Sequence, residues 1–113
     1  MSKILICEKE EGIRESLKQI LSDRYELILT DGLSQCLDCL RHGKDINLVI
    51  LENDPNIVKR IKEKQPDLKV VVLANHKDTK QAEKSVKLGV SGYLMKPFKP
   101  DEIQTSISNF LTS

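Results

Sequence analysis

Five short runs of β-branched and aliphatic residues alternate along the chain with segments whose apolar residues recur every three or four positions. The runs span residues 3–7, 25–30, 46–51, 69–74 and 91–95. The intervening segments predict helices, the first of them marked by Ile13, Leu17, Ile20 and Leu21. Five strands alternating with five helices indicate a parallel sheet wrapped on both sides.

Residues 48–51 and 70–73 are apolar at every position, as expected of central strands that are covered on both faces. With right-handed crossovers, the pattern predicts a flavodoxin-like α/β fold. This is a three-layer sandwich with five helices and a five-stranded parallel sheet of order 2-1-3-4-5. We expect residues 1–113 to form a single domain, because this length suits one compact unit. The functional crevice of such a fold lies at the carboxyl ends of its central strands.

Glycine and proline mark the predicted helix boundaries. Gly43 and Gly89 stand where helices should end in a left-handed residue, and Pro55 and Pro100 suit helix starts.

The charges of the chain are nearly balanced, with 18 basic and 17 acidic residues and a formal net charge of +1. Such a balance provides no strong field to attract nucleic acid or an anionic membrane, so we expect neither as a direct partner. No apolar run approaches the roughly 20 residues that a membrane helix needs. With three cysteines and no secretory signal, the sequence predicts a reducing, cytoplasmic setting.

Three segments at the strand ends resemble a known family. The opening KILICEKE is an apolar strand followed by acidic residues, and NLVILE is a strand that ends in a carboxylate. The segment LGVSGYLMKPF combines a glycine that ends a helix, an aromatic residue and a Lys-Pro-Phe sequence. Together they resemble the receiver domains of two-component response regulators across essentially the whole chain.

The resemblance implies a defined phosphorylation site. In that family two carboxylates after the first strand and an acceptor aspartate after the third hold Mg²⁺. A Thr or Ser after the fourth strand and a Lys after the fifth bind the phosphoryl oxygens. These roles fall here on Glu8 and Lys9, on Glu52, on Ala74 and on Lys96.

Most of these positions depart from the family pattern. A unit positive charge at Lys9, roughly 4 Å from a divalent ion, would cost about 8 kcal/mol at an effective dielectric constant of about 20. Glu52 is one methylene longer than the usual acceptor, and Ala74 lacks the hydroxyl. We therefore expect a degenerate receiver with no bound metal, no cofactor and no enzymatic activity.

The sequence leaves two interpretations of the remaining pocket charges. Lys96 and Lys9 could face Glu52 and Glu8, with Lys96 holding the Glu52 carboxylate in place of a phosphoryl group; ordinary charge compensation is the alternative. Asp54 is either a substitute phosphoacceptor or the N-cap of the helix that starts at Pro55.

The resemblance also implies an interaction surface on the fourth helix, fifth strand and fifth helix. It includes Tyr93 as a switch-type aromatic and the residues Lys84, Lys87, Lys99, Asp101 and Glu102. The predicted function is a phosphorylation-independent interaction module for a protein partner or effector domain. Homodimerisation through this surface is a second option.

Two alternative functions remain: a working phosphoacceptor that uses Glu52 or Asp54, and a thiol redox sensor. The sensor would use Cys36 and Cys39, although their spacing within a helix favours buried small hydrophobes.

Overall fold

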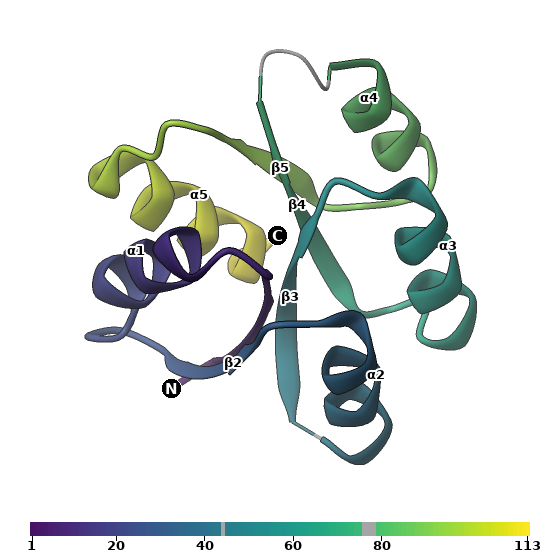
Figure 1. Ribbon diagram of the computed structural model, residues 1–113, viewed down its shortest axis with the longest axis horizontal. Coiled ribbons are helices and arrows are strands. Elements are labelled where there is room, and N and C mark those ends of the chain that lie inside the picture. The colour runs from purple at the N-terminus through teal and green to yellow at the C-terminus, as the bar shows by residue number, and fades with distance from the viewer. Residues whose placement is uncertain (44, 76–78) are drawn as a thin grey trace.

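The central sheet of the protein is parallel throughout and has the strand order β2-β1-β3-β4-β5 (Figure 1). The computed structural model describes residues 1–43, 45–75 and 79–113. The strands are β1 (Lys3–Cys7), β2 (Glu26–Thr30), β3 (Ile46–Glu52), β4 (Lys69–Ala74) and β5 (Gly92–Met95). The helices are α1 (Glu11–Leu21), α2 (Leu33–His42), α3 (Pro55–Lys64), α4 (Thr79–Lys87) and α5 (Pro100–Thr112). The predicted flavodoxin-like topology is confirmed. In the described ranges, no helix is long and apolar enough to cross a membrane.

Alternating side chains of the strands build one core on each face of the sheet. Ile4 and Ile6 of β1 belong to a core with α1 and α5, whereas Leu5 and Cys7 belong to a core with α2 and α3. Figure 1 shows the same division, with α1 and α5 on one side of the sheet and α2, α3 and α4 on the other. Because both faces are covered, the central strands β3 and β4 are apolar at consecutive positions, as the sequence predicted.

The register of the strands aligns their carboxyl ends along one edge of the sheet. Cys7 pairs with Leu51, the next residue Glu52 pairs with Leu73, and Ala74 pairs with Met95. The residues that follow β1, β3 and β5 therefore emerge close together.

All four predicted helix boundaries are confirmed, since α2 also ends at His42, directly before Gly43. Pro55 and Pro100 stand at helix starts, and Gly89 has a positive φ of 94°. The left-handed conformation predicted for Gly43 is wrong, because this residue is extended, with φ −90° and ψ 110°. A Cβ at Gly43 would lie 2.5 Å from the carbonyl oxygen of Cys39, so glycine permits a close backbone approach here and not a left-handed turn.

A lysine from the sheet holds the end of the last helix. Nζ of Lys69 donates hydrogen bonds to the carbonyl oxygens of Phe110, Leu111 and Ser113, at 2.8, 3.0 and 2.9 Å. These carbonyls lack partners within the helix, and the lysine charge also complements the negative end of the helix dipole. The contact fixes α5 against the start of β4.

Candidate functional site

The carboxyl ends of β1, β3 and β5 surround a small polar cavity of about 160 Å³. Its lining includes four of the residues that the sequence singled out: Glu8, Lys9, Glu52 and Lys96. Glu10, Asn53 and Leu73 complete the lining. The topology thus gathers side chains from positions far apart in the sequence at one edge of the sheet.

The side chain of Glu8 is the most constrained group in the cavity. The residue is 3% exposed, and its Oε1 accepts a hydrogen bond of 3.2 Å from the backbone N–H of Glu10. Across the described residues, Oε2 has no hydrogen-bond partner. Burial raises the pKa of Glu8 above its usual value, and the Glu52 carboxylate adds to this rise. The Glu10 N–H and the Lys96 charge act in the opposite direction but do not cancel it.

The backbone that carries Glu8 and Lys9 is held from α1. Nη1 of Arg14 donates hydrogen bonds to the carbonyl oxygens of Glu8 and Lys9, at 2.9 and 3.2 Å. The Glu8 N–H in turn donates to the carbonyl oxygen of Thr30, at 3.1 Å. These contacts hold the backbone of the turn between β1 and α1, and this turn places Glu8 and Lys9 in the cavity lining.

Lys96 is positioned by the backbone of the neighbouring strand. Its N–H donates a hydrogen bond of 2.9 Å to the carbonyl oxygen of Ala74, and the peptide bond between Lys96 and Pro97 is cis. Ala74 itself is 1% exposed and is not among the residues that line the cavity. The position that the family resemblance assigns to a hydroxyl is therefore occupied by a buried methyl group.

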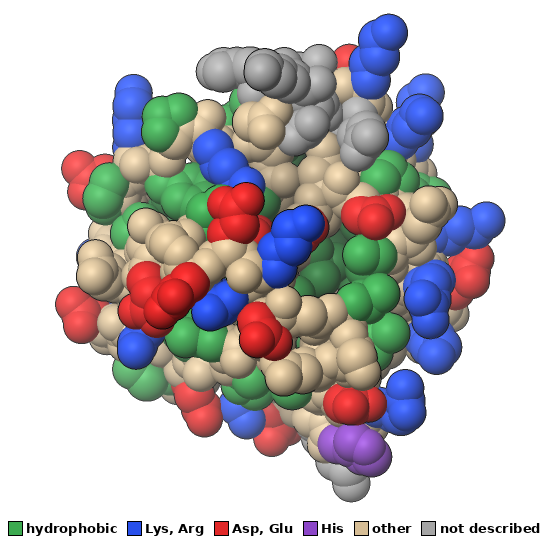
Figure 2. All heavy atoms as spheres, in the orientation of Figure 1, with side chains coloured by type: hydrophobic (Ala, Val, Ile, Leu, Met, Phe, Trp, Pro, Cys, Tyr) green, Lys and Arg blue, Asp and Glu red, His purple; other side chains and the backbone are tan. Residues whose placement is uncertain are grey.

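The charges in the cavity do not form direct ion pairs. In ranges 1–43, 45–75 and 79–113, the ion pairs are Arg41–Asp38 and Lys99–Glu102, both at 3.9 Å and both exposed. Lys96 thus acts on Glu8 through its charge at longer range, and it does not clamp Glu52 as one of the two sequence interpretations required. Figure 2 shows acidic and basic side chains intermixed on the face seen in Figure 1, with hydrophobic side chains between them.

Asp54 acts as a helix cap. Its Oδ1 accepts a hydrogen bond of 3.0 Å from the N–H of Asn56, and Pro55 follows it at the first helical position of α3. The interpretation of Asp54 as an N-cap is confirmed. Asp54 is also absent from the lining of the cavity.

Sequence reasoning missed the role of Asn53. This residue lines the cavity directly after Glu52, and its Oδ1 accepts a hydrogen bond of 3.2 Å from Oγ of Ser85, which is fully buried on α4. A polar residue that follows the last residue of a central strand was the available signal. Asn53 therefore connects the cavity to α4.

The residues of the predicted interaction surface lie on α4, β5 and the start of α5. Tyr93 is 47% exposed on β5, the edge strand of the sheet, and Val86 of α4 is exposed to a similar extent. The charged members are all exposed: Lys84, Lys87, Lys99, Asp101 and Glu102.

Within the described part of the chain, no group of three or more His, Cys, Asp or Glu residues is arranged to hold a metal ion.

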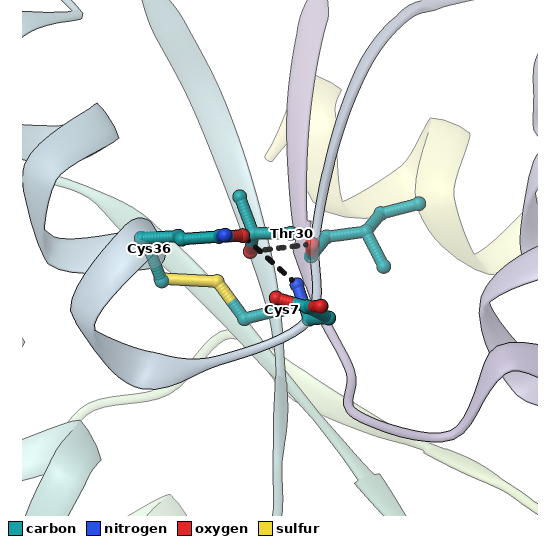
Figure 3. Close-up of a disulfide and its surroundings, with 6 residues drawn as sticks. Cys7, Thr30 and Cys36 are labelled. Atoms are coloured by element: carbon teal, nitrogen blue, oxygen red, sulfur yellow. Dashed lines mark hydrogen bonds between the residues drawn. A yellow bond between two sulfur atoms is a disulfide. The ribbon is translucent and has the colours of Figure 1, made fainter.

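A disulfide lies beside the cavity and joins a pair of cysteines that the sequence did not suggest. Cys7 at the end of β1 and Cys36 on α2 point toward one another next to Thr30, with α carbons 5.9 Å apart (Figure 3). The pairing considered from the sequence, Cys36 with Cys39, is wrong, because Cys39 is a free thiol. Cys7 sits on the sheet face that α2 covers, and this was the missed signal.

The family model of the response regulator receiver domain matches residues 4–108. The chain belongs to this family. It is 26% identical to sporulation initiation phosphotransferase F of Bacillus subtilis, over 96% of this chain and 93% of the relative. It is 27% identical to the DNA-binding transcriptional regulator NtrC of Proteus hauseri, of which it spans 20%.

Among solved structures, a response regulator from Thermotoga maritima superposes on this receiver domain with a TM-score of 0.90 and 26% identity. The match covers 100% of this chain and 99% of that one. The chain is therefore a signal-transduction receiver domain of the two-component type, and it spans about a fifth of one relative and nearly all of another. The polar cavity is lined by Glu8, Lys9, Glu52 and Lys96, four of the positions to which the family resemblance assigned phosphorylation-site roles.

Proposed function

We propose that this receiver domain is a phosphorylation-independent interaction module. The observation that carries the proposal is the composition of the cavity. Lys9 lines it where the family resemblance implies a second metal-binding carboxylate, and Glu8 is buried with one oxygen unpartnered among the described residues. A proton competes with Mg²⁺ for a carboxylate whose pKa is raised, and Lys9 brings a positively charged residue to the lining in place of a ligand for the ion.

The acceptor side of the cavity supports the same conclusion. Glu52 carries its carboxylate roughly 1.5 Å farther from the backbone than an aspartate would, and in-line transfer depends on positioning at this scale. Ala74 provides no hydroxyl to bind a transferred phosphoryl group. Among the five positions to which the resemblance assigns phosphorylation-site roles, Lys96 alone keeps the family's residue type.

A working phosphoacceptor is the competing function, since Glu52 and Lys96 line the same cavity. The test is incubation of the chain with acetyl phosphate and Mg²⁺, followed by intact mass spectrometry. We expect no phosphoryl adduct on the unmodified chain. A fourfold variant that restores the family pattern (Glu8→Asp, Lys9→Asp, Glu52→Asp, Ala74→Thr) is the matched control and should gain one.

A stable adduct on the unmodified chain would contradict the proposal. Glu52→Gln and Asp54→Asn would then identify the acceptor, because each removes one candidate carboxylate. Asn also retains the ability to cap α3, so loss of the adduct in Asp54→Asn would not reflect loss of the helix start.

The partner in this proposal is a protein or an effector domain in the cytoplasm, bound through α4, β5 and α5. Tyr93 and Val86 supply exposed apolar area, and the mixed charges around them suit complementary contacts across a symmetric dimer. The near-zero net charge gives no reason to expect nucleic acid or a membrane as a direct partner.

Sedimentation equilibrium of the unmodified chain and of Tyr93→Ala tests self-association. We expect the unmodified chain to dimerise and the variant to be monomeric. An unmodified chain that remains monomeric at high concentration would exclude dimerisation through this surface.

A further inference from the structure

The Cys7–Cys36 disulfide connects the functional edge of the sheet to a helix that is otherwise held mainly by packing. Cys7 is the last residue of β1 and directly precedes Glu8, while Cys36 lies in the first turn of α2, 29 residues later. The bond thus ties the strand end that carries Glu8 and Lys9 to the amino-terminal end of α2 (Figure 3).

The two sulfur-bearing residues differ in their access to solvent. Cys36 is fully buried, whereas Cys7 is 7% exposed. Cys7 also lines a second cavity of about 180 Å³ between the end of β1, the loop before α2 and the start of α3. The other lining residues are Glu8, Lys9, Asp31, Gly32, Leu33, Leu51, Glu52 and Ile57. The cavity beside Cys7 is thus the side from which a small thiol would approach the bond.

We propose that Cys7 and Cys36 form a reversible redox site, and that its oxidation state controls the order of the first turn of α2. The reactant is a low-molecular-weight thiol of the glutathione class. This goes beyond the proposed interaction function and does not depend on it. The site extends the thiol chemistry considered from the sequence, but to a different pair of residues.

The exchange proceeds in two balanced steps. A glutathione thiolate attacks Sγ of Cys7, the bond to Cys36 breaks, and Cys36 leaves with the electron pair as a thiolate in the first turn of α2. The positive end of the helix dipole favours a thiolate there. A second glutathione thiolate then attacks the glutathione sulfur, which releases Cys7 and one molecule of oxidised glutathione. Two electrons and two protons pass to the cysteines, and oxidised glutathione reverses the sequence.

The contacts of α2 indicate which part of the fold responds. The carboxyl end of the helix is held independently of the disulfide, because Nε2 of Gln65 donates a hydrogen bond of 3.2 Å to the carbonyl oxygen of Leu40, which also packs in the core. At the amino end, the Cys36 N–H donates to the carbonyl oxygen of Gly32 at 3.1 Å, beside the second cavity. Reduction therefore releases the end of the helix that borders the cavity and leaves the other end in place.

The test begins with counting thiols on the full chain. The protein is equilibrated in buffers of reduced and oxidised glutathione, quenched in acid, labelled with a maleimide and weighed intact. Under oxidised glutathione Cys39 is expected to carry one label or one glutathione adduct, and under excess reduced glutathione three labels are expected, since the chain has 3 cysteines and Cys39 is free. Cys39→Ser is the matched control, with no label and two labels expected. Three labels under oxidised glutathione, or one label that persists in excess reduced glutathione, would overturn the proposal.

Tryptic mapping of the unmodified chain and of Cys39→Ser identifies the pair, because a link that persists in the variant must involve Cys36. Cleavage places Cys7 in the peptide of residues 4–9, and both other cysteines in the peptide of residues 25–41. We expect these two peptides to be linked before reduction; an internal link within residues 25–41 would overturn the assignment. Hydrogen exchange should be faster at residues 31–36 in the reduced form and unchanged at residues 39–42. Equal exchange at residues 31–36 in both forms would refute the control of α2.

Discussion

The N–H of Glu10 donates a hydrogen bond of 3.2 Å to Oε1 of Glu8, and within the described residues this is the one hydrogen bond to that buried carboxylate. A buried carboxylate with a single donor is poorly compensated for its lost hydration. Burial with this single donor accounts for the raised pKa of Glu8.

The free energy of unfolding should fall as pH rises above 4.5, the usual pKa of Glu8. The folded state binds the Glu8 proton more tightly than the unfolded state does, so stability is lost as pH rises through the raised folded pKa. Glu8→Gln removes this loss and should stabilise the protein at pH 7 by about 1–2 kcal/mol. Urea titrations of both proteins between acidic and neutral pH measure the difference.

The control for this effect is Glu63→Gln, which makes the same change at an exposed position of α3. It should shift the urea midpoint little at any pH. A constant difference between Glu8→Gln and the unmodified chain from acidic to neutral pH would contradict the account of Glu8.

Asp54→Ala should lower the free energy of unfolding by about 1 kcal/mol, because it removes the side-chain acceptor for the Asn56 N–H at the start of α3. Asp54→Asn should retain most of the stability, because an amide oxygen can accept the same hydrogen bond. Thermal unfolding of the two variants measures the difference. Equal losses in both would show that Asp54 contributes through its charge and not as a cap.

Gly92→Ala should destabilise the contact between β5 and α5 by about 1–3 kcal/mol. A Cβ at this position would lie 2.6 Å from Cε1 and Cζ of Phe110. Phe110→Leu removes those ring atoms, so the loss caused by Gly92→Ala should be smaller in that background. A double-mutant cycle measured by urea unfolding tests the pair, and strictly additive losses would rule out the predicted clash.

Reduction of the Cys7–Cys36 disulfide should lower the free energy of unfolding by about 3–4 kcal/mol, because the bond closes a loop with a sequence separation of 29 residues. Calorimetric melts with and without reductant, on the Cys39→Ser background, measure this loss without interference from the third thiol. Cys7→Ala/Cys36→Ala should melt at the same temperature in both conditions. A reductant-dependent shift that survives in this double variant would assign the effect elsewhere.

Much of the fold follows from local patterns. The uninterrupted apolar runs of β3 and β4 predicted central strands, and the alternation of strands and helices predicted the sheet order. Some observed strand ends differ from the predicted ones by one residue. β3 was predicted to end at residue 51 and ends at Glu52, because hydrogen bonding to the neighbouring strand, and not residue type, decides where a strand stops. The error at Gly43 has a similar origin, since its need for glycine comes from the approach of the Cys39 carbonyl oxygen.

The membership of the candidate site was predictable only in part, because Asn53 was missed and Asp54 and Ala74 do not line the cavity. Topology and family resemblance brought Glu8, Lys9, Glu52 and Lys96 together, and all four line the cavity. Whether Lys96 would clamp Glu52 depends on side-chain distances that no spacing encodes. The pairing of Cys7 with Cys36 depends on which face of β1 is covered by α2, which becomes apparent only when the sheet is assembled.

Titration calorimetry with magnesium tests the central claim, which is that this receiver domain, with Lys9 where the family resemblance implies a metal-binding carboxylate, does not bind the ion that phosphotransfer requires. We predict no saturable binding to the unmodified chain at millimolar Mg²⁺, and recovery of binding in a variant that combines Glu8→Asp, Lys9→Asp and Glu52→Asp. Saturable binding to the unmodified chain that disappears in Glu52→Gln would contradict the account.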